Sequence, residues 1–117
     1  MKISMNLPEG WRFIPLERVA EIILSNVDKK SGKGEAVVQL CNYTDVYYND
    51  IIDKNIEFME ATATPREIER FSLRHGDVLI TKDSETPDDI AVPALVNDTL
   101  ENVLCGYHLA ILRPRNN

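Results

Sequence analysis

Four acidic residues that fall close together, Asp83, Glu85, Asp88 and Asp89, are the residues of this sequence best placed for metal chemistry. Clustered carboxylates supply the oxygen ligands that Mg²⁺ takes. A metal-dependent nuclease with a Pro-Asp and Asp/Glu-x-Lys pattern would also need a lysine beyond Asp88, but the last lysine of the chain is Lys82. The sequence therefore predicts no nuclease site, and we expect no bound metal.

The other residues that could do chemistry show no catalytic arrangement. His75 and His108 are far apart in the sequence, no serine or cysteine stands in a nucleophile elbow, and Gly32-Lys33-Gly34 is only a fragment of a phosphate-binding glycine loop. No Asn-Pro-Pro-Tyr or related adenine-methylating motif occurs. We therefore expect no catalytic residue and no cofactor, with His75 in a turn and His108 in a strand.

Charge is distributed unevenly along the chain, and this bears on nucleic-acid binding. The formal net charge of −6 argues against a general affinity for phosphate backbones, because lysine and arginine supply that affinity. Residues 1–40 carry six basic and five acidic residues, whereas the remainder carries seven basic and fourteen acidic ones. The best local basic cluster is the loop that contains Lys29, Lys30 and Lys33. A solvated loop without a ligand explains these lysines equally well.

Length and composition indicate one globular domain, residues 1–117. The chain is 44% hydrophobic and 27% charged, which is ordinary for globular proteins. It has no apolar run of roughly 18 residues and no secretion signal, so we expect a soluble, cytoplasmic protein. Cys41 and Cys105 each end an apolar run and have no metal-ligand spacing, which predicts two buried free thiols.

Two short helices are expected to support these groups. Apolar residues recur at three- and four-residue spacing after Pro15, which predicts an amphipathic helix over Leu16–Leu24. A second helix should run from Thr64 to about Phe71, with Thr64 as its N-cap and Glu67 reaching back to the cap amide.

Strands and turns account for most of the rest. A turn at Leu7–Trp11 should be pinned to the core by Trp11 and Phe13, and Gly76-Asp77 marks a second turn. The polar, aromatic stretch Asn42–Asp50 and the polar stretch Lys82–Asp89 are predicted to be exposed loops. Strands are expected at Ala36–Cys41, Val78–Ile80, Ile90–Val96 and Val103–Leu112. The predicted fold is α+β, with a small mixed, largely antiparallel β-sheet and two short helices.

Several of these segments occur in a recognisable order. Together with the helix from Leu16, they resemble the target recognition domain of the specificity subunit of type I restriction–modification systems, over nearly the whole chain. Leu-Pro-x-Gly-Trp openings and Gly-Asp-Val-Leu-Ile segments are frequent in that family. The segments are Leu7-Pro8-Glu9-Gly10-Trp11, Leu40–Val46, Phe71–Asp83 with its Gly76-Asp77-Val78-Leu79-Ile80 run, and Val103–Pro114.

The resemblance implies a unit that reads DNA sequence and does no chemistry itself. In that family a specificity subunit carries two such domains, each reading half of a split target, separated by long helices that set the spacing. The helices dock methyltransferase (modification) subunits, which use S-adenosylmethionine to methylate adenine, and a further motor subunit performs cleavage. The implied partners are therefore double-stranded DNA and the modification and restriction subunits.

The sequence also departs from the family pattern. The family's domain usually continues past Arg113-Pro114 into more strands and helices and then a spacer helix, with a Leu-Pro-Pro and Glu-Gln signature that this chain lacks. We therefore interpret the chain as a fragment, either a truncated gene product or a remnant that holds the first part of one recognition domain. Because a domain cut inside its sheet should leave an unpaired edge strand, we also expect a homodimer.

DNA-contacting residues have to be chosen by chemistry, since the family's base contacts vary with the target. Amide, hydroxyl and cationic side chains read base edges, while Lys, Arg, Ser, Thr and Tyr contact phosphates. Tyr43 and Tyr47 could equally pack on the core, and Lys82 could pair with Asp83 or Glu85. The candidates are Lys29, Lys30 and Lys33 for phosphates, and Asn42, Tyr43, Thr44, Tyr47, Lys82, Ser84 and Thr86 for the groove.

Two functions of different class remain open at this point. The first is a DNA-recognition module, and the second is a protein-interaction module or remnant that binds a methyltransferase subunit, or dimerises, through an open sheet edge. Salt dependence separates them, because binding through several phosphate contacts weakens steeply as salt rises, whereas an apolar interface does not.

Overall fold

The structure is a computed structural model that describes residues 6–28, 32, 35–83 and 86–115. Its elements in chain order are α1 (Leu16–Val19), β1 (Ala20–Leu24), β2 (Ala36–Cys41), α2 (Tyr43–Tyr47), β3 (Ile51–Ile52), β4 (Met59–Ala63), α3 (Pro65–Phe71), β5 (Val78–Thr81), the 3-10 turn η1 (Pro87–Asp89), β6 (Pro93–Val96), β7 (Val103–Cys105) and β8 (Leu109–Pro114). None of the helices in these described ranges is long and apolar enough to cross a membrane.

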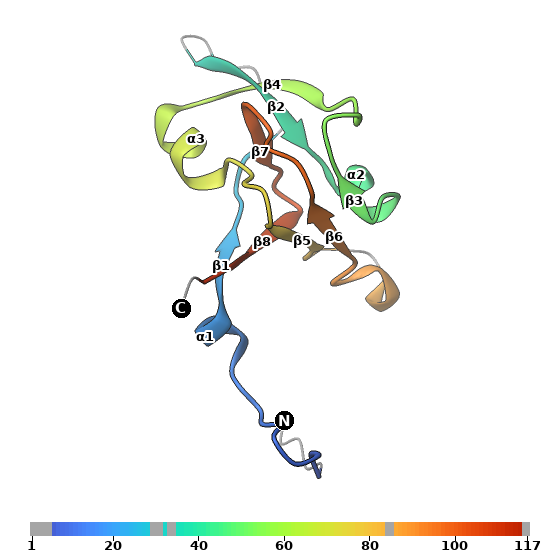
Figure 1. Ribbon diagram of the computed structural model, residues 1–117. Helices are drawn as coiled ribbons and strands as arrows, with labels where there is room; N and C mark the ends of the chain where they lie inside the picture. The colour runs from blue at the N-terminus through green and yellow to red at the C-terminus, as the bar shows by residue number, and fades with distance from the viewer. Residues whose placement is uncertain (1–5, 29–31, 33–34, 84–85, 116–117) are drawn as a thin grey trace.

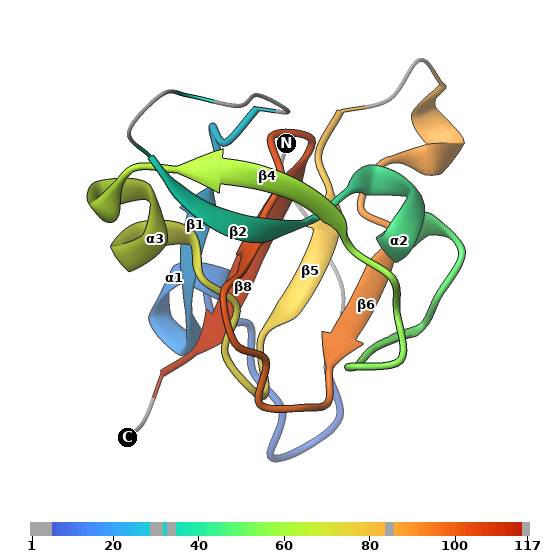
Figure 2. The same ribbon diagram turned by 90° about the horizontal axis from the view of Figure 1, so that it is seen from above.

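The strands form two sheets that lie one over the other (Figures 1 and 2). The larger sheet has the order β1-β8-β5-β6-β3, and only its β6–β3 pair is parallel. The smaller sheet has the order β4-β2-β7, with β2 and β7 parallel. The predicted α+β class with mixed, largely antiparallel pairing is therefore confirmed, but the strands divide between two sheets where one was expected.

The core fills the space between the sheets and follows the alternation of side chains along each strand. Leu79 on β5 and Ile111 on β8 are fully buried and face the smaller sheet, whereas their neighbours Val78 and Leu112 point the other way and are only half-buried. A second cluster, around Phe71 and Leu104, joins α3 to the smaller sheet. Cys41 and Cys105 are both buried and free, as the sequence predicted.

The predicted helix over Leu16–Leu24 is wrong beyond its first turn. Only Leu16–Val19 is helical, and Ala20–Leu24 is a strand that pairs with β8 along its whole length. A single helical turn is costly to nucleate, and the β-branched Ile22 and Ile23 favour extended backbone. Their spacing also satisfies a strand, since Ile23 faces the core while Ile22 lies outward.

The predicted second helix is confirmed with its cap. Thr64 Oγ1 accepts a hydrogen bond from the Glu67 amide at 3.2 Å, and the Glu67 carboxylate accepts one from the Thr64 amide at 2.9 Å. This reciprocal capping box begins α3, and Phe71 buries its ring at the other end of the helix.

The stretch Asn42–Asp50, expected to be a loop, contains the helix α2. Asn42 is its N-cap, and the Asp45 carboxylate accepts a hydrogen bond from the Asn42 amide at 2.9 Å. Asn42 and Asp45 form a capping box in which Asn takes the place of Ser/Thr and Asp that of Glu/Gln. A local signal for the helix was therefore present in the sequence, although these residues were assigned to a polar loop. Val46 turns inward and is buried, which anchors the helix.

The last two predicted strands are each broken by a turn. Val103–Leu112 divides into β7 and β8, which belong to different sheets, and His108 lies in the turn between them, so its predicted strand position is wrong. A side chain at Gly106 would lie 2.7 Å from the Cys41 carbonyl oxygen, so only glycine fits this turn. The strand expected from Ile90 begins at Pro93, because Ala91 has a φ of 65° that ends extended backbone.

The N-terminal segment is not anchored as predicted. The turn itself is present, with the Trp11 amide donating to the Pro8 carbonyl at 3.1 Å. However, Trp11 is 71% exposed and Phe13 is 58% exposed, because the segment before α1 runs away from both sheets (Figure 1). We call residues 6–15 the arm.

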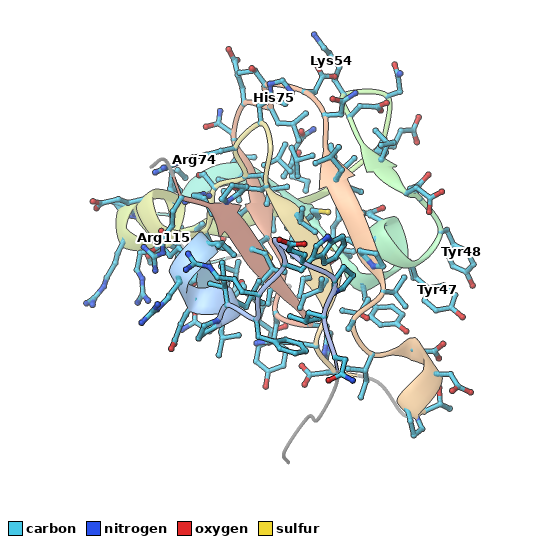
Figure 3. All side chains as sticks on the ribbon, turned by 60° about the horizontal axis from the view of Figure 1, so that its bottom comes forward. Tyr47, Tyr48, Lys54, Arg74, His75 and Arg115 are labelled. Atoms are coloured by element: carbon cyan, nitrogen blue, oxygen red, sulfur yellow. The ribbon has the colours of Figure 1, made fainter. Side chains whose placement is uncertain are left out.

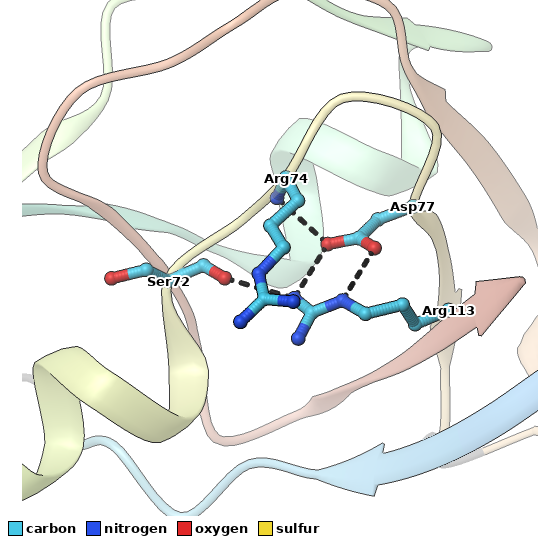
Figure 4. A network of polar contacts seen from close by, with 4 residues as sticks. All are labelled: Ser72, Arg74, Asp77 and Arg113. Carbon is cyan, nitrogen blue, oxygen red and sulfur yellow. Dashed lines mark hydrogen bonds and ion pairs between the residues drawn. The ribbon is translucent and has the colours of Figure 1, made fainter. Parts of the chain in front are cut away.

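A buried ion pair joins the Gly76-Asp77 turn to β8 (Figure 4). Arg113 donates from Nε and Nη2 to the two oxygens of Asp77, each at 2.9 Å, and Nη2 also donates to the Ser72 carbonyl at 3.0 Å. The Arg74 amide donates to Asp77 Oδ2 at 2.8 Å. The Asp77 hydrogen bond is the main reason that the pKa of Arg113 is raised above its ordinary value.

Candidate nucleic-acid interface

Four segments, two of which carry candidate contact residues from the sequence, meet at one edge of the molecule. In the registers of the sheets, Leu24 lies opposite Ala110, Thr81 opposite Leu109, and Cys41 opposite Cys105. The carboxyl ends of β1, β2, β5 and β7 therefore lie together beside the start of β8. We call the described segments that follow them, namely 25–28, 42–48, 82–83 with 86–89, and 106–108, the loop edge.

Hydrogen bonds tie these segments together across the two sheets. Ser25 Oγ donates to the Cys105 carbonyl at 2.5 Å, and the Lys82 ammonium donates to the Ser25 carbonyl at 2.9 Å. The Gly106 amide donates to the Cys41 carbonyl at 2.9 Å. The ammonium of Lys82 also lies 5.2 Å from the centre of the Tyr107 ring, a cation–π distance.

A second set of contacts holds α2 against η1. The Tyr47 hydroxyl donates to Asp89 Oδ1 at 3.1 Å, and Thr86 Oγ1 donates to Asp89 Oδ2 at 2.8 Å. The hydrogen bond to Asp89 is the main reason that the pKa of Tyr47 is raised above its ordinary value of 10.0. The Tyr43 and Tyr47 rings are stacked with their centres 5.6 Å apart, and Tyr48 meets Tyr47 edge-on. The result is a tyrosine surface beside η1.

A hollow of about 180 Å³ lies between these two groups of contacts. Its lining combines aromatic, amide and acidic side chains, which are types that stack on bases or hydrogen-bond to their edges. The lining residues are Val27, Asp28, Leu40, Asn42, Tyr43, Gly106, Tyr107 and His108.

The structure places the described candidates from the sequence in this one region. Tyr43, Thr44 and Tyr47 lie on α2, Asn42 caps it, Lys82 follows β5, and Thr86 precedes η1. The predicted alternative in which Lys82 pairs with Asp83 is not what the structure shows, since Asp83 contacts His108 at 3.4 Å and Lys82 binds the Ser25 carbonyl. Lys29, Lys30, Lys33 and Ser84 lie outside the described residues.

Sequence reasoning missed Ser25, Tyr107 and His108, which the fold brings to the loop edge. Tyr107 and His108 were assigned to the interior of a strand, and Ser25 to the end of a helix. The glycine at position 106 was the available signal, since a glycine inside an apolar strand pattern often marks a bend or a close backbone approach.

The described part of the loop edge is acidic. It contains Asp28, Asp45, Asp83, Asp88 and Asp89 but a single lysine, Lys82. Acidic side chains repel phosphates, so the described part of this edge does not favour a nucleic-acid backbone by its charge. No group of three or more His, Cys, Asp or Glu within the described ranges is arranged to hold a metal ion.

Arginines gather away from the loop edge. Figure 3 shows Arg74 and Arg115 on one side of the molecule and Tyr47 and Tyr48 on the other. A groove of about 520 Å³ beside β1 and α3 has Arg70, Arg74 and Arg113 in its lining. Glu21 and Glu69 also line it, so the groove carries both signs of charge and has no strong preference for an anion.

Comparison with known proteins supports the fold. Neither a protein-family model nor a curated protein matches the chain. Among solved structures the chain is similar to the HsdS subunit from Thermoanaerobacter tengcongensis, a type I specificity subunit, with 23% sequence identity and a TM-score of 0.52. The match covers 96% of this chain and 25% of that one, so the chain spans about a quarter of the HsdS subunit. The resemblance inferred from the sequence is thus confirmed at the level of the fold.

Proposed function

We propose that the chain is a non-catalytic DNA-recognition module of a type I specificity subunit. Residues 1–117 would form part of one target recognition domain, and the loop edge would lie against double-stranded DNA. Modification and restriction subunits of the same system would be directed to the target through this contact. The observation that carries the proposal is the convergence of four strand ends on one edge that bears amide, hydroxyl, aromatic and lysine side chains, within a fold similar to that of HsdS.

The charges at and near the loop edge suggest which residues contact phosphates and which contact bases. Lys29, Lys30 and Lys33, which closely follow residues 25–28 in the sequence, are proposed to supply the phosphate contacts, since the described part of the loop edge is acidic. Asn42, Tyr43, Thr44, Tyr47, Lys82, Ser84 and Thr86 are proposed to face the groove. Carboxylates such as Asp28 can accept from the exocyclic amine of cytosine, so acidity beside a base pocket is compatible with base reading.

The first test measures how DNA binding responds to salt. Binding of the chain to duplex DNA is expected to weaken steeply between 50 and 200 mM salt, on the order of tenfold or more if three phosphates are contacted. Replacing Lys29, Lys30 and Lys33 together with alanine should lower the slope of log K against log salt by about 2.7, at roughly 0.9 per phosphate contact. Fluorescence anisotropy with a labelled duplex measures both quantities.

A matched control for the lysine variant is Lys54→Ala. Lys54 is an exposed lysine whose ion pair with Asp98, at 3.8 Å, lies away from the loop edge. The slope should stay unchanged in this variant. Equal slopes in the triple variant and the native chain would contradict phosphate binding by Lys29, Lys30 and Lys33.

Lys82→Ala is expected to weaken binding to a cognate duplex by about 1–3 kcal/mol if Lys82 reads a base. The structure gives Lys82 a positioning contact as well, because its ammonium binds the Ser25 carbonyl. Urea unfolding therefore accompanies the binding assay, and Lys82→Arg retains the charge as a second variant. Unchanged affinity together with unchanged sequence preference in Lys82→Ala would remove this residue from the contact set.

The second candidate function is a protein-interaction module that binds a methyltransferase subunit or a second copy through an open sheet edge. Strand β1 favours it, because among the described residues β1 is one of the two outer strands of the larger sheet. The Arg115 amide donates to the Val19 carbonyl, so residues 19, 21 and 23 bond toward β8, and the amides of Ile22 and Leu24 point to the free side. Complex formation that survives high salt would favour this candidate over DNA recognition.

A further inference from the structure

An uninterrupted row of aliphatic side chains crosses the outer face of the larger sheet. Each member lies opposite the next in the strand registers, on the face turned away from the smaller sheet. Ile22, Leu95 and Ile51 are 45%, 40% and 41% exposed, and the two residues between them are half-buried. The row runs Ile22, Leu112, Val78, Leu95 and Ile51, one residue from each of β1, β8, β5, β6 and β3.

A second row lies beside the first and is also apolar. It runs Leu24, Ala110, Ile80 and Pro93 across β1, β8, β5 and β6. Leu24 is 61% exposed, which is unusual for a leucine in a strand. An antiparallel sheet with one face in water normally alternates apolar and polar residues, whereas strands covered on both faces are apolar throughout. The outer face therefore has the composition of a sheet with a further layer on it.

The arm carries a matching apolar surface. Trp11, Phe13 and Ile14 are 71%, 58% and 43% exposed, and Leu16 in α1 is 49% exposed. The arm and α1 connect directly to β1, whose Ile22 begins the first row. The views in Figures 1 and 3 place the arm on the side of the larger sheet that faces away from the smaller sheet.

We propose that the outer face of the larger sheet binds a second copy of this chain, with the arm of each copy lying across the aliphatic rows of the other. A two-fold interface must be self-complementary, and here the exposed Trp11, Phe13 and Ile14 of the arm and the apolar receiving face belong to the same chain. Neither row contains a charged residue, so the receiving face itself brings no ion that has to be desolvated.

The apolar area is sufficient for a stable contact. The exposed parts of the arm, α1 and row side chains add up to on the order of 800 Å², since a single aromatic side chain carries about 150–250 Å². A standard interface buries about 800 Å² on each partner. Trp11 and Phe13 would be the aromatic anchors, a residue class in which interface energy concentrates.

The face-to-face arrangement goes beyond the DNA recognition proposed above and differs from pairing through the β1 edge. Leu95 lies on β6, which is separated from β1 by β8 and β5. A charge at position 95 would therefore disrupt packing on the face and leave edge pairing intact. The test uses no DNA, so its outcome is independent of whether the loop edge binds nucleic acid.

The experiment combines sedimentation velocity with the fluorescence of Trp11, which is the one tryptophan of the chain. Between roughly 1 and 100 µM, a range that spans typical weak self-association, the native chain should pass from monomer to dimer while the Trp11 emission shifts to shorter wavelength. Leu95→Lys should stay monomeric over the same range, with Trp11 emission that remains characteristic of water. Circular dichroism checks that the variant is folded.

Two further variants make the result decisive. Val37→Lys places the same charge on β2 of the smaller sheet, at a valine that is 64% exposed, and should leave the dimer unchanged. Trp11→Ala changes an exposed side chain that the fold does not need, and should weaken the dimer at least about tenfold. Three results would each overturn the proposal. The native chain could stay a monomer at all concentrations, its Trp11 emission could lie at short wavelength independently of concentration, or its dimer could be unaffected by Leu95→Lys and Trp11→Ala.

Discussion

Replacing Asp77 with alanine is expected to lower the free energy of unfolding by about 3–5 kcal/mol, which is the cost of breaking a buried ion pair from one side. Asp77 is 1% exposed and accepts hydrogen bonds from the side chain of Arg113 and the amide of Arg74. Its removal would leave the Arg113 guanidinium, whose side chain is 13% exposed, without its anionic partner. Urea unfolding followed by circular dichroism measures the change.

The exposed pair Lys54–Asp98 provides the control. Its atoms are 3.8 Å apart and the lysine side chain is 73% exposed, so Lys54→Ala should change stability by less than about 1 kcal/mol. Removing both charges with Asp77→Ala and Arg113→Met together should cost less than Asp77→Ala alone, because no unpaired guanidinium remains. A loss below 1 kcal/mol in Asp77→Ala would mean that water or another group takes the place of the carboxylate.

The chain is also expected to lose stability at alkaline pH, because both cysteines are buried as neutral thiols. Burial raises the pKa of Cys105 from 9.0 to about 12, and burial likewise raises the pKa of Cys41 well above 9.0. Below pH 9 the thiols are protonated in both states and the full stability is present. As the pH rises from 9 toward 12, the unfolded thiols release their protons while the folded ones keep them, so unfolding becomes more favourable.

The expected loss from Cys105 is on the order of 4 kcal/mol between pH 9 and pH 12, at about 1.4 kcal/mol for each pKa unit. Urea unfolding measured at intervals across this range gives the dependence. Tyrosine and lysine also titrate there, so the matched control is the Cys41→Ala and Cys105→Ala double variant. Its unfolding free energy should fall less steeply with pH, and identical slopes for the two proteins would contradict the assignment to the thiols.

Features that depend on a few consecutive residues could be predicted from the sequence. The capped helix after Thr64, the turn at Gly76 and the strands predicted at Ala36–Cys41 and Val78–Ile80 each follow from local hydrogen bonding or from a short apolar run. The structure extends the second of these strands by one residue, to Thr81. The free, buried state of both cysteines followed in the same way. The resemblance to a type I specificity subunit depended on such local segments and their order, and the structural comparison bears it out for the fold.

Predictions from local patterns were wrong where the same spacing of apolar residues fits both a helix and a strand. Ile22 and Ile23 satisfy both a helical and an extended pattern, and pairing with β8 decides between them. Val103–Leu112 has apolar runs on both sides of Gly106-Tyr107-His108, so the glycine alone, and no change of periodicity, marks the turn at which the chain passes from one sheet to the other. Strands β3 and β4 had no distinct pattern at all, because Ile51–Ile52 is too short and Met59–Ala63 has only small residues facing inward.

The sequence by itself determined the types of side chain available for DNA contact and the local elements that carry several of them. Only the tertiary structure decided which of those side chains lie together, because strand register is set by burial of one face and by pairing between residues far apart in the chain. Register brings Ser25, Asn42, Lys82 and Tyr107 to the loop edge. The same register aligns one aliphatic residue from each of five strands into a row that no segment of the sequence contains.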